Sequence, residues 1–99
     1  MDRARLEAMS ANYRRGRAYE YRVIRQLQAE GYYAGRSAGS HGLFDVWAIN
    51  GFRWRLIQVK SGRARMTRAE QAAFRELPGP ERTTKEIWTY KKGLTVEVL

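Results

Sequence analysis

The chain contains no cysteine among its 99 residues. Disulfide frameworks, thiolate zinc sites and cysteine nucleophiles are therefore excluded. Its apolar runs are short, and none approaches the roughly 20 residues that span a bilayer. The opening segment MDRARLEAMSANYRRGR is charged throughout, which is not typical of a signal peptide. We therefore expect one cytoplasmic domain over residues 1–99 with no membrane partner, near the smallest size at which a single core suffices.

Acidic residues are also scarce, with 10 Asp and Glu against 19 Lys and Arg. The net charge of +9 is spread along the chain and favours a polyanionic partner, nucleic acid before an anionic membrane surface. Arginine supplies 15 of the cations and lysine only four. The planar guanidinium suits phosphate contacts, although the composition of the genome explains this preference equally well.

The apolar pattern predicts the order helix, three strands, helix, two strands. Spacings of three and four residues predict a first helix that ends at Gly31, with Gly16 as a candidate interruption. YYAGRS, FDVWAI and RWRLIQVK have strand composition, and NG between the last two predicts a hairpin. Thr67 and Glu70 have capping-box spacing, so a second helix is expected from about Thr67 to Leu77, before PGP. KEIWTYKKGLTVEVL then predicts two strands, giving an α/β or α+β domain on one sheet.

A polar constellation lies on the two strands of this hairpin. Strand alternation turns Gln58 and Lys60 to one face and Val59 to the other. Asp45 stands between Phe44 and Val46, where an ordinary strand carries an apolar residue, and the hairpin brings it toward Lys60. A two-residue turn would pair Asp45 near Leu56, whereas a longer turn would move it toward Gln58.

Glu20 is the charged member of an otherwise apolar helical stripe that continues through Val23, Ile24 and Leu27. That stripe should face the sheet, where a carboxylate is costly unless a cation or hydrogen-bond donors receive it. The alternative interpretation is a structural ion pair of Glu20 with Arg17 or Arg36.

Together these residues match the requirements of a hydrolytic metal site. Mg²⁺, or alternatively Mn²⁺, prefers oxygen ligands, which the side chains of Glu20, Asp45 and Gln58 and the carbonyl of Val59 can provide. Lys60 would orient or help to deprotonate the attacking water and offset charge on the scissile phosphate.

The segment GRAYEYRVIRQLQAEGYYAGRSAGSHGLFDVWAINGFRWRLIQVKSG resembles the PD-(D/E)XK nucleases, and among them the archaeal-type Holliday junction resolvases. The similarity covers roughly residues 16–62. It implies a restriction-endonuclease-like fold, with a mixed central sheet flanked by helices in the order α-β-β-β-α-β-β. It also implies a homodimer, prokaryotic or phage-encoded, that spans the two symmetric strands of a four-way DNA junction.

The resemblance carries over Glu20, Asp45 and Lys60 as catalytic positions, with Gln58 at the second acidic position. Glutamine there is a departure, because the resolvases usually carry glutamate, and an amide oxygen binds Mg²⁺ less strongly than a carboxylate. Three functions stay open at this point: a resolvase, a nuclease for other branched or linear DNA, and a non-catalytic DNA-binding module.

Several further residues are candidates for DNA contact. The resemblance implies this role for Arg36, Ser37 and Ser40, and the basic pattern or loop position adds these: Arg14, Arg17, His41, Arg63, Arg65 and Arg68. Arg14 and Arg17 fit a solvated helix face equally well, and a lone histidine in a Gly-Ser loop is most often simply exposed. No base-reading motif is present, so these contacts are expected to be to phosphates.

Overall fold

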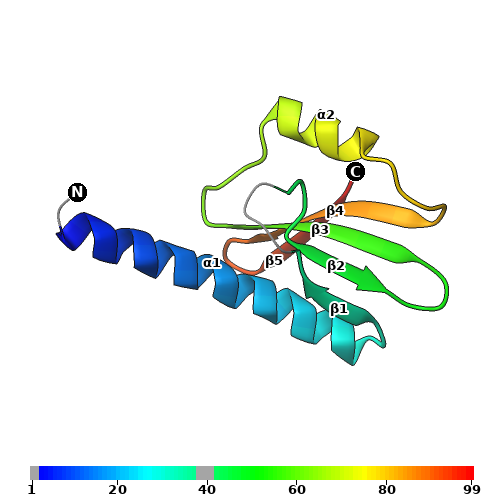
Figure 1. Ribbon diagram of the computed structural model, residues 1–99, viewed down its shortest axis with the longest axis horizontal. Helices are drawn as coiled ribbons and strands as arrows, with labels where there is room; N and C mark the ends of the chain where they lie inside the picture. The colour runs from blue at the N-terminus through cyan, green and yellow to red at the C-terminus, as the bar shows by residue number, and fades with distance from the viewer. Residues whose placement is uncertain (1–2, 38–41) are drawn as a thin grey trace.

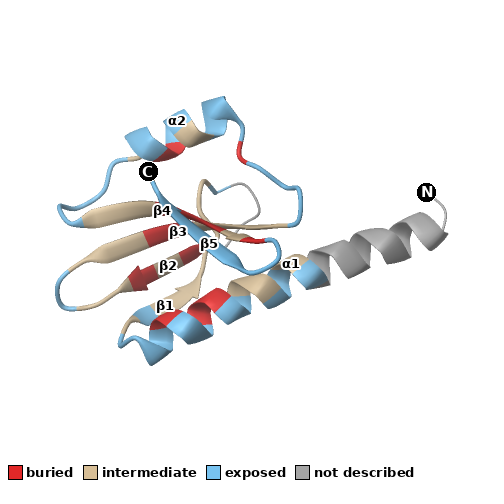
Figure 2. Ribbon diagram, turned by 180° about the vertical axis from the view of Figure 1, so that it is seen from behind, coloured by how far each residue is buried: buried red, intermediate tan, exposed pale blue. Residues whose placement is uncertain are grey.

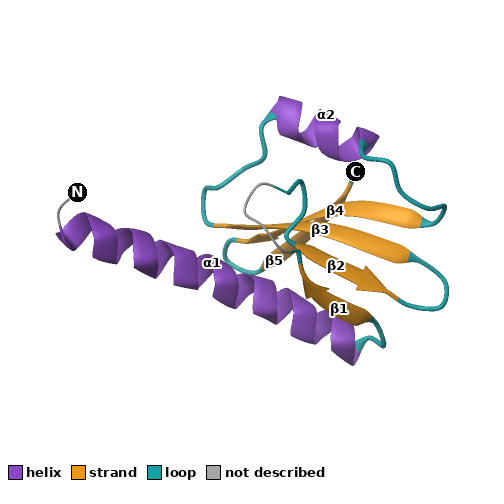
Figure 3. Ribbon diagram, in the orientation of Figure 1, coloured by secondary structure: helices purple, strands orange, loops and turns teal. Residues whose placement is uncertain are grey.

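Five strands form one mixed sheet that carries a helix on each face (Figure 1, Figure 3). This computed structural model describes the backbone of residues 3–37 and 42–99, and the side chains of residues 15–37 and 42–99. The predicted α/β architecture and the predicted order of elements are confirmed. The elements are α1 (Arg3–Ala29), β1 (Tyr33–Arg36), β2 (Val46–Ile49), β3 (Trp54–Ser61), α2 (Arg68–Glu76), β4 (Thr83–Tyr90) and β5 (Leu94–Val98).

The strands follow one another across the sheet in chain order, β1-β2-β3-β4-β5. Three neighbouring pairs are antiparallel, and only β3 and β4 run parallel. A parallel pair needs a long crossover connection, and α2 lies in that connection. The sheet is therefore mixed because a helix is inserted between its third and fourth strands.

The hairpin between β2 and β3 has a longer turn than its NG dipeptide alone suggests. Ile49 pairs with Trp54, so four residues connect the strands. The reason lies in Asn50, whose side-chain oxygen accepts hydrogen bonds from the amides of Phe52 at 2.8 Å and Arg53 at 2.7 Å. Such local bonds hold a wider turn closed. Of the two registers that the sequence left open, the longer-turn register is the one observed.

Helix α1 continues through Gly16, so the predicted interruption there is wrong. A single glycine inside a helix costs only about 1 kcal/mol relative to alanine, which the turns on either side evidently outweigh. The helix ends at Ala29, two residues before the expected stop at Gly31, which adopts a left-handed φ of +93° in the following turn. Among the described helices, none is both long and apolar enough to cross a membrane.

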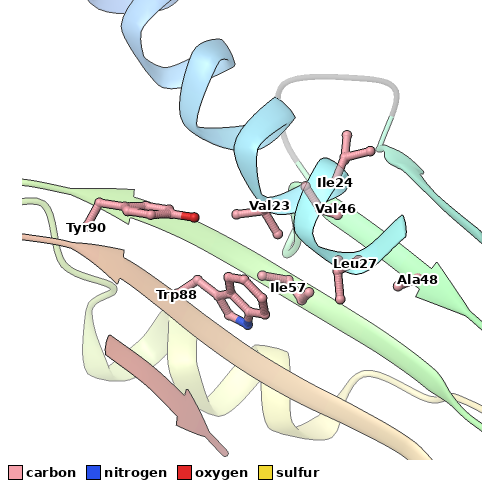
Figure 4. Close-up of a cluster of buried hydrophobic side chains, with 8 residues drawn as sticks. All are labelled: Val23, Ile24, Leu27, Val46, Ala48, Ile57, Trp88 and Tyr90. Carbon is pink, nitrogen blue, oxygen red and sulfur yellow. The ribbon is translucent and has the colours of Figure 1, made fainter. Parts of the chain in front are cut away.

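The first of two apolar clusters lies between α1 and the sheet (Figure 4). It comprises Val23, Ile24, Leu27, Val46, Ala48, Ile57, Trp88 and Tyr90. Figure 2 shows the corresponding buried stretch near the C-terminal end of α1, where the helix packs on the sheet. Val59 packs against this cluster beside Ile57, so the two residues share a face of the sheet.

The second apolar cluster lies between α2 and the opposite face of the sheet. It comprises Leu56, Met66, Phe74 and Ile87. Since Leu56 belongs to this cluster, alternation along β3 turns Gln58 and Lys60 toward the α2 side. Of the three tryptophans, Trp88 is fully buried, whereas Trp47 and Trp54 are partly exposed.

Both ends of α2 are capped. The capping box is confirmed, because Thr67 accepts from the Glu70 amide at 3.1 Å and Glu70 accepts from the Thr67 amide at 2.9 Å. At the other end the ammonium group of Lys85 on β4 donates to the carbonyls of Arg75 and Leu77. A cation suits the negative end of the helix dipole. These caps fix α2 over the face that carries Gln58 and Lys60.

Candidate active site

Asp45 lies at the point where β1, β2 and β3 come together. Its Oδ2 accepts a hydrogen bond of 2.8 Å from the amide of Val59. Its own amide donates to the Ile57 carbonyl at 2.8 Å, and its carbonyl accepts from the Ser37 amide at 2.8 Å. Because Val46 pairs with Ile57, the register places Asp45 opposite Gln58. These three bonds therefore hold Asp45 against the polar end of β3.

The surroundings of Asp45 disfavour its charged form. Burial raises the pKa of this carboxyl above its ordinary value, and the negative charge of Glu20 raises it further. The Val59 amide, Lys60 and Arg36 act in the opposite direction without cancelling the rise. Burial is the larger of the two effects, so the charge of Asp45 is poorly solvated in this position.

Glu20 reaches this region from α1. Its Oε1 accepts from Nε of Arg36 at 3.2 Å, and the two side chains are 18% and 27% exposed. The Arg36 guanidinium also lies over the ring of Tyr21, 5.7 Å from its centroid. The ion pair of Glu20 with Arg36, one of the two alternatives from the sequence, is thus observed. Glu20 also acts electrostatically on Asp45. Arg36 is accordingly a positioning residue for Glu20 in this arrangement.

Gln58 carries an unusual buried oxygen. Among the described residues, none donates a hydrogen bond to its Oε1, which is inaccessible to solvent. A buried polar atom left without a partner costs about 1–3 kcal/mol, so such atoms commonly mark a ligand, ion or water site. Its position opposite Asp45 makes this oxygen a candidate ligand for a cation.

Lys60 lines a cleft of about 280 Å³ on the α2 side of the sheet. The segment between β3 and α2 supplies Arg65 and Met66 to this cleft, and the C-terminal hairpin supplies Lys91 and Glu97. The charge of Lys60 partly offsets the rise in the pKa of Asp45. The pKa of Glu70 is lowered mainly by its two hydrogen bonds to Thr67, and the charge of Lys60 lowers it further. Lys60 thus lies between Asp45, on which its charge acts, and the cleft that its side chain lines.

Only two of the four metal ligands expected from the sequence, Glu20 and Asp45, are carboxylates. Within the described residues no group of three His, Cys, Asp or Glu side chains is arranged to hold a metal. The structure brings Glu20 and Lys60 each within electrostatic reach of Asp45 and sets Gln58 opposite Asp45. The hydrogen bond from the Val59 amide to the Asp45 carboxylate was not predicted, because no local sequence pattern indicates it.

The residues proposed for DNA contact differ in their exposure and position. Arg17, Arg63 and Arg68 are exposed, and so is Arg65, whose Nη1 also donates to the carbonyls of Gly62 and Ala64 at 3.2 and 2.8 Å. Arg36 and Ser37 belong to the strand end beside Asp45. The side chain of Arg14, and all of Ser40 and His41, lie outside the described residues.

Arg55 and Glu86 form a buried ion pair that was not predicted from the sequence. Glu86 is 1% exposed and accepts from Arg55 Nε at 2.9 Å and Nη2 at 2.8 Å. Thr84 and the Trp88 indole also donate to Glu86, at 2.5 and 3.0 Å. Burial opposes ionisation, but these donors hold the pKa of Glu86 below its ordinary value. Alternation in TTKEIWTY could have revealed this residue, because it shares a face with two aromatic residues.

No model of a known protein family matches this chain. The relation to the PD-(D/E)XK nucleases therefore stays a prediction, carried by the sequence similarity. The structure adds the α/β fold and the spatial grouping of Glu20, Asp45, Gln58 and Lys60, and function follows from these only as a proposal.

Proposed function

We propose that the protein is a metal-dependent, structure-selective DNA endonuclease with a restriction-endonuclease-like fold, resembling the Holliday junction resolvases. One observation carries the proposal most directly. The Asp45 carboxylate is fixed to β3 by the Val59 amide, opposite Gln58 and within electrostatic reach of Glu20 and Lys60. Acidic and basic groups from two strands and a helix thus converge on one end of the sheet.

The donor set fits Mg²⁺ or Mn²⁺. The buried Gln58 Oε1 has no hydrogen-bond donor among the described residues, and burial and the charge of Glu20 disfavour the ionised form of Asp45, which a bound cation would favour. Glu20, Asp45, Gln58 and the Val59 carbonyl would hold the ion through oxygen atoms. When bound, such an ion stabilises negative charge on a phosphoryl group and makes a coordinated water more acidic.

The remaining chemistry belongs to residues of this chain. Lys60 directs a cationic side chain into the cleft, where it orients the attacking water and offsets charge that develops on the scissile phosphate. Asp45 holds its geometry through the Val59 amide during this step. Arg36 positions Glu20 by their 3.2 Å contact. Hydrolysis then needs no covalent intermediate on the protein.

The substrate is proposed from the charge and the resemblance together. A net charge of +9 and exposed arginines after β3 suit the phosphate backbone rather than base edges. A homodimer would present two such sites to the symmetric strands of a four-way junction and introduce paired nicks. Other branched, nicked or linear DNA forms the alternative substrate class.

A second candidate function is a non-catalytic DNA-binding module with the same fold. The observation that favours it is Gln58, which leaves Asp45 and Glu20 as the two carboxylates of the described site. Such a site holds a divalent ion more weakly than one with three carboxylates. DNA binding through the arginines would survive this loss.

The proposal is tested by comparing a synthetic four-way junction, a flap and a linear duplex at one salt concentration, with Mg²⁺ or Mn²⁺. Equal salt matters because backbone binding falls steeply with ionic strength. We expect paired nicks in the junction, and their loss in Lys60→Met but not in the control Arg25→Met, which alters an exposed cation on α1. Binding without nicking of any substrate would instead support the DNA-binding module.

A further inference from the structure

A second basic pocket, of about 190 Å³, lies between α1 and the turn that joins β4 to β5. Its lining includes Tyr19 and Arg22 from α1, Tyr90 at the end of β4, and Lys91, Lys92 and Gly93 from the turn. Three of these side chains are cationic, and no residue that lines the pocket is acidic. The pocket therefore offers concentrated positive charge in a concave space.

Arg22 is held in this pocket by aromatic rings rather than by a carboxylate. Its Cζ lies 4.9 Å from the centroid of the Tyr90 ring and 5.9 Å from that of Tyr19. The two rings stack on each other with centroids 4.8 Å apart. Cation–π contact fixes the guanidinium but leaves its N–H groups available, and among the described residues no carboxylate forms an ion pair with Arg22. This is a preorganised anion-binding group.

The turn adds two adjacent lysines. The Lys91 amide donates to the Gly93 carbonyl at 2.9 Å, closing a short connection between Tyr90 and Leu94. Lys92 adopts a left-handed φ of +51°, a conformation that is strained for a non-glycine residue. Glycine would adopt this conformation with less strain, so the lysine adds a positive charge at a position where its backbone is strained.

The pocket adjoins the candidate active site. Tyr19 precedes Glu20 on α1, and Tyr90 pairs with Ser61, which follows Lys60 on β3. The Tyr90 carbonyl accepts from the Gly62 amide at 2.9 Å. Lys91 lines both this pocket and the cleft that holds Lys60. A chain of phosphates that passes Lys60 would therefore reach Lys91 and then Arg22.

We propose that the pocket formed by Tyr19, Arg22, Tyr90, Lys91 and Lys92 binds a phosphate of the DNA backbone that flanks the cleaved phosphodiester. The identity of the ligand rests on the proposed nuclease function. A phosphate fits better than a stacked base, because the two tyrosine rings stack on each other and Arg22 lies over both.

The test is DNA binding in EDTA by the double variant Arg22→Gln/Lys92→Gly, measured against salt for a labelled four-way junction and a duplex. Glycine tolerates the left-handed turn, so the fold should survive. We expect weaker binding to both DNAs and a slope of log K against log salt that is smaller by about 1. Arg22→Lys, which keeps the charge, should retain the slope. The matched control Arg25→Gln/Arg75→Gln removes two exposed cations elsewhere and should retain wild-type binding.

A second measurement locates the anion directly. Inorganic phosphate, titrated into the labelled protein, should shift the amide NMR signals of Tyr19, Arg22 and residues 91–93, and the double variant should lose these shifts. An unchanged slope and affinity in the double variant, or phosphate shifts confined to other regions, would overturn the proposal. If the slope falls as expected but no DNA is ever nicked, the phosphate pocket stands and the nuclease function fails.

Discussion

The carboxylate of Asp45 is joined to the backbone amide of Val59 by a hydrogen bond of 2.8 Å. This bond ties the residue before β2 to the strand that carries Gln58 and Lys60. It also stabilises the ionised carboxylate, yet burial and the charge of Glu20 prevail and keep the pKa of Asp45 raised. The carboxylate of Asp45 is thus anchored to β3 in a buried position that disfavours its charge.

Replacing Asp45 by Asn should stabilise the metal-free protein at neutral pH. The folded-state pKa of Asp45 is raised above its ordinary value of 3.8, mainly by burial, so its contribution to stability is fully present below pH 3.8. That contribution is lost as the pH rises through the folded-state pKa. Asn retains an oxygen for the Val59 amide. Urea unfolding in EDTA should give the variant a higher free energy of unfolding at pH 7, and the difference should shrink toward pH 4.

The pH dependence of that difference provides the check. A difference between Asp45→Asn and the wild type that is independent of pH, or that widens as the pH falls, would mean that Asp45 does not titrate in the expected manner. The exposed substitution Glu76→Gln on α2 serves as the matched control and should show no comparable dependence.

Divalent ions should stabilise the wild-type protein. An ion that binds only the folded state at ten times its dissociation constant adds about 1.4 kcal/mol to the free energy of unfolding. We expect Mg²⁺ and Mn²⁺ to raise the melting temperature at pH 7, and Asp45→Asn to abolish most of this rise. Equal shifts in the two proteins would place the bound ion elsewhere.

Gln58→Glu should convert the site to three carboxylates. Without metal, the added negative charge beside Asp45 and Glu20 should lower the melting temperature. With Mg²⁺, the stabilisation should exceed that of the wild type, and less Mg²⁺ should give half-maximal nicking. Gln28→Glu, at an exposed position of α1, is the control. Nicking by Gln58→Glu alone, with an inactive parent, would favour the DNA-binding module.

The buried pair of Arg55 and Glu86 should contribute to stability rather than to chemistry. Arg55 and Lys60 are five residues apart on β3, about 16 Å at the usual rise of a strand. Removing one member leaves the other charge buried, so Glu86→Gln should cost about 3–5 kcal/mol. The double variant Arg55→Met/Glu86→Gln should cost less than the sum of its single changes in urea unfolding. Additive costs would show that the pair is not coupled.

Local patterns predicted much of this fold because the relevant forces are local. Strand alternation correctly turned Val59 and Lys60 to opposite faces of the sheet, and the spacing of Thr67 and Glu70 correctly predicted the cap of α2. Residue preferences also identified each of the five strands. These features depend on backbone geometry that neighbouring residues share.

What the sequence did not settle depends on contacts that no local pattern contains. The hairpin register was decided by the Asn50 side chain bonding two amides of the turn, and the continuity of α1 by helical turns on both sides of Gly16. The partner of Glu86 could not be predicted because Arg55 lies 31 positions away in the chain. The partnership of Glu20 and Arg36 was one of two alternatives until the strand and helix were placed together.

Cleavage of a synthetic four-way junction in Mg²⁺ by the wild type, Asp45→Asn and the control Glu76→Gln tests the central claim most directly. If Asp45 belongs to a phosphodiester-hydrolysing site, the wild type and the control will introduce paired nicks. Asp45→Asn will bind the junction with its nicking rate lowered by at least about 100-fold, in line with the loss of an essential catalytic group. Unchanged cleavage by Asp45→Asn would contradict the assignment.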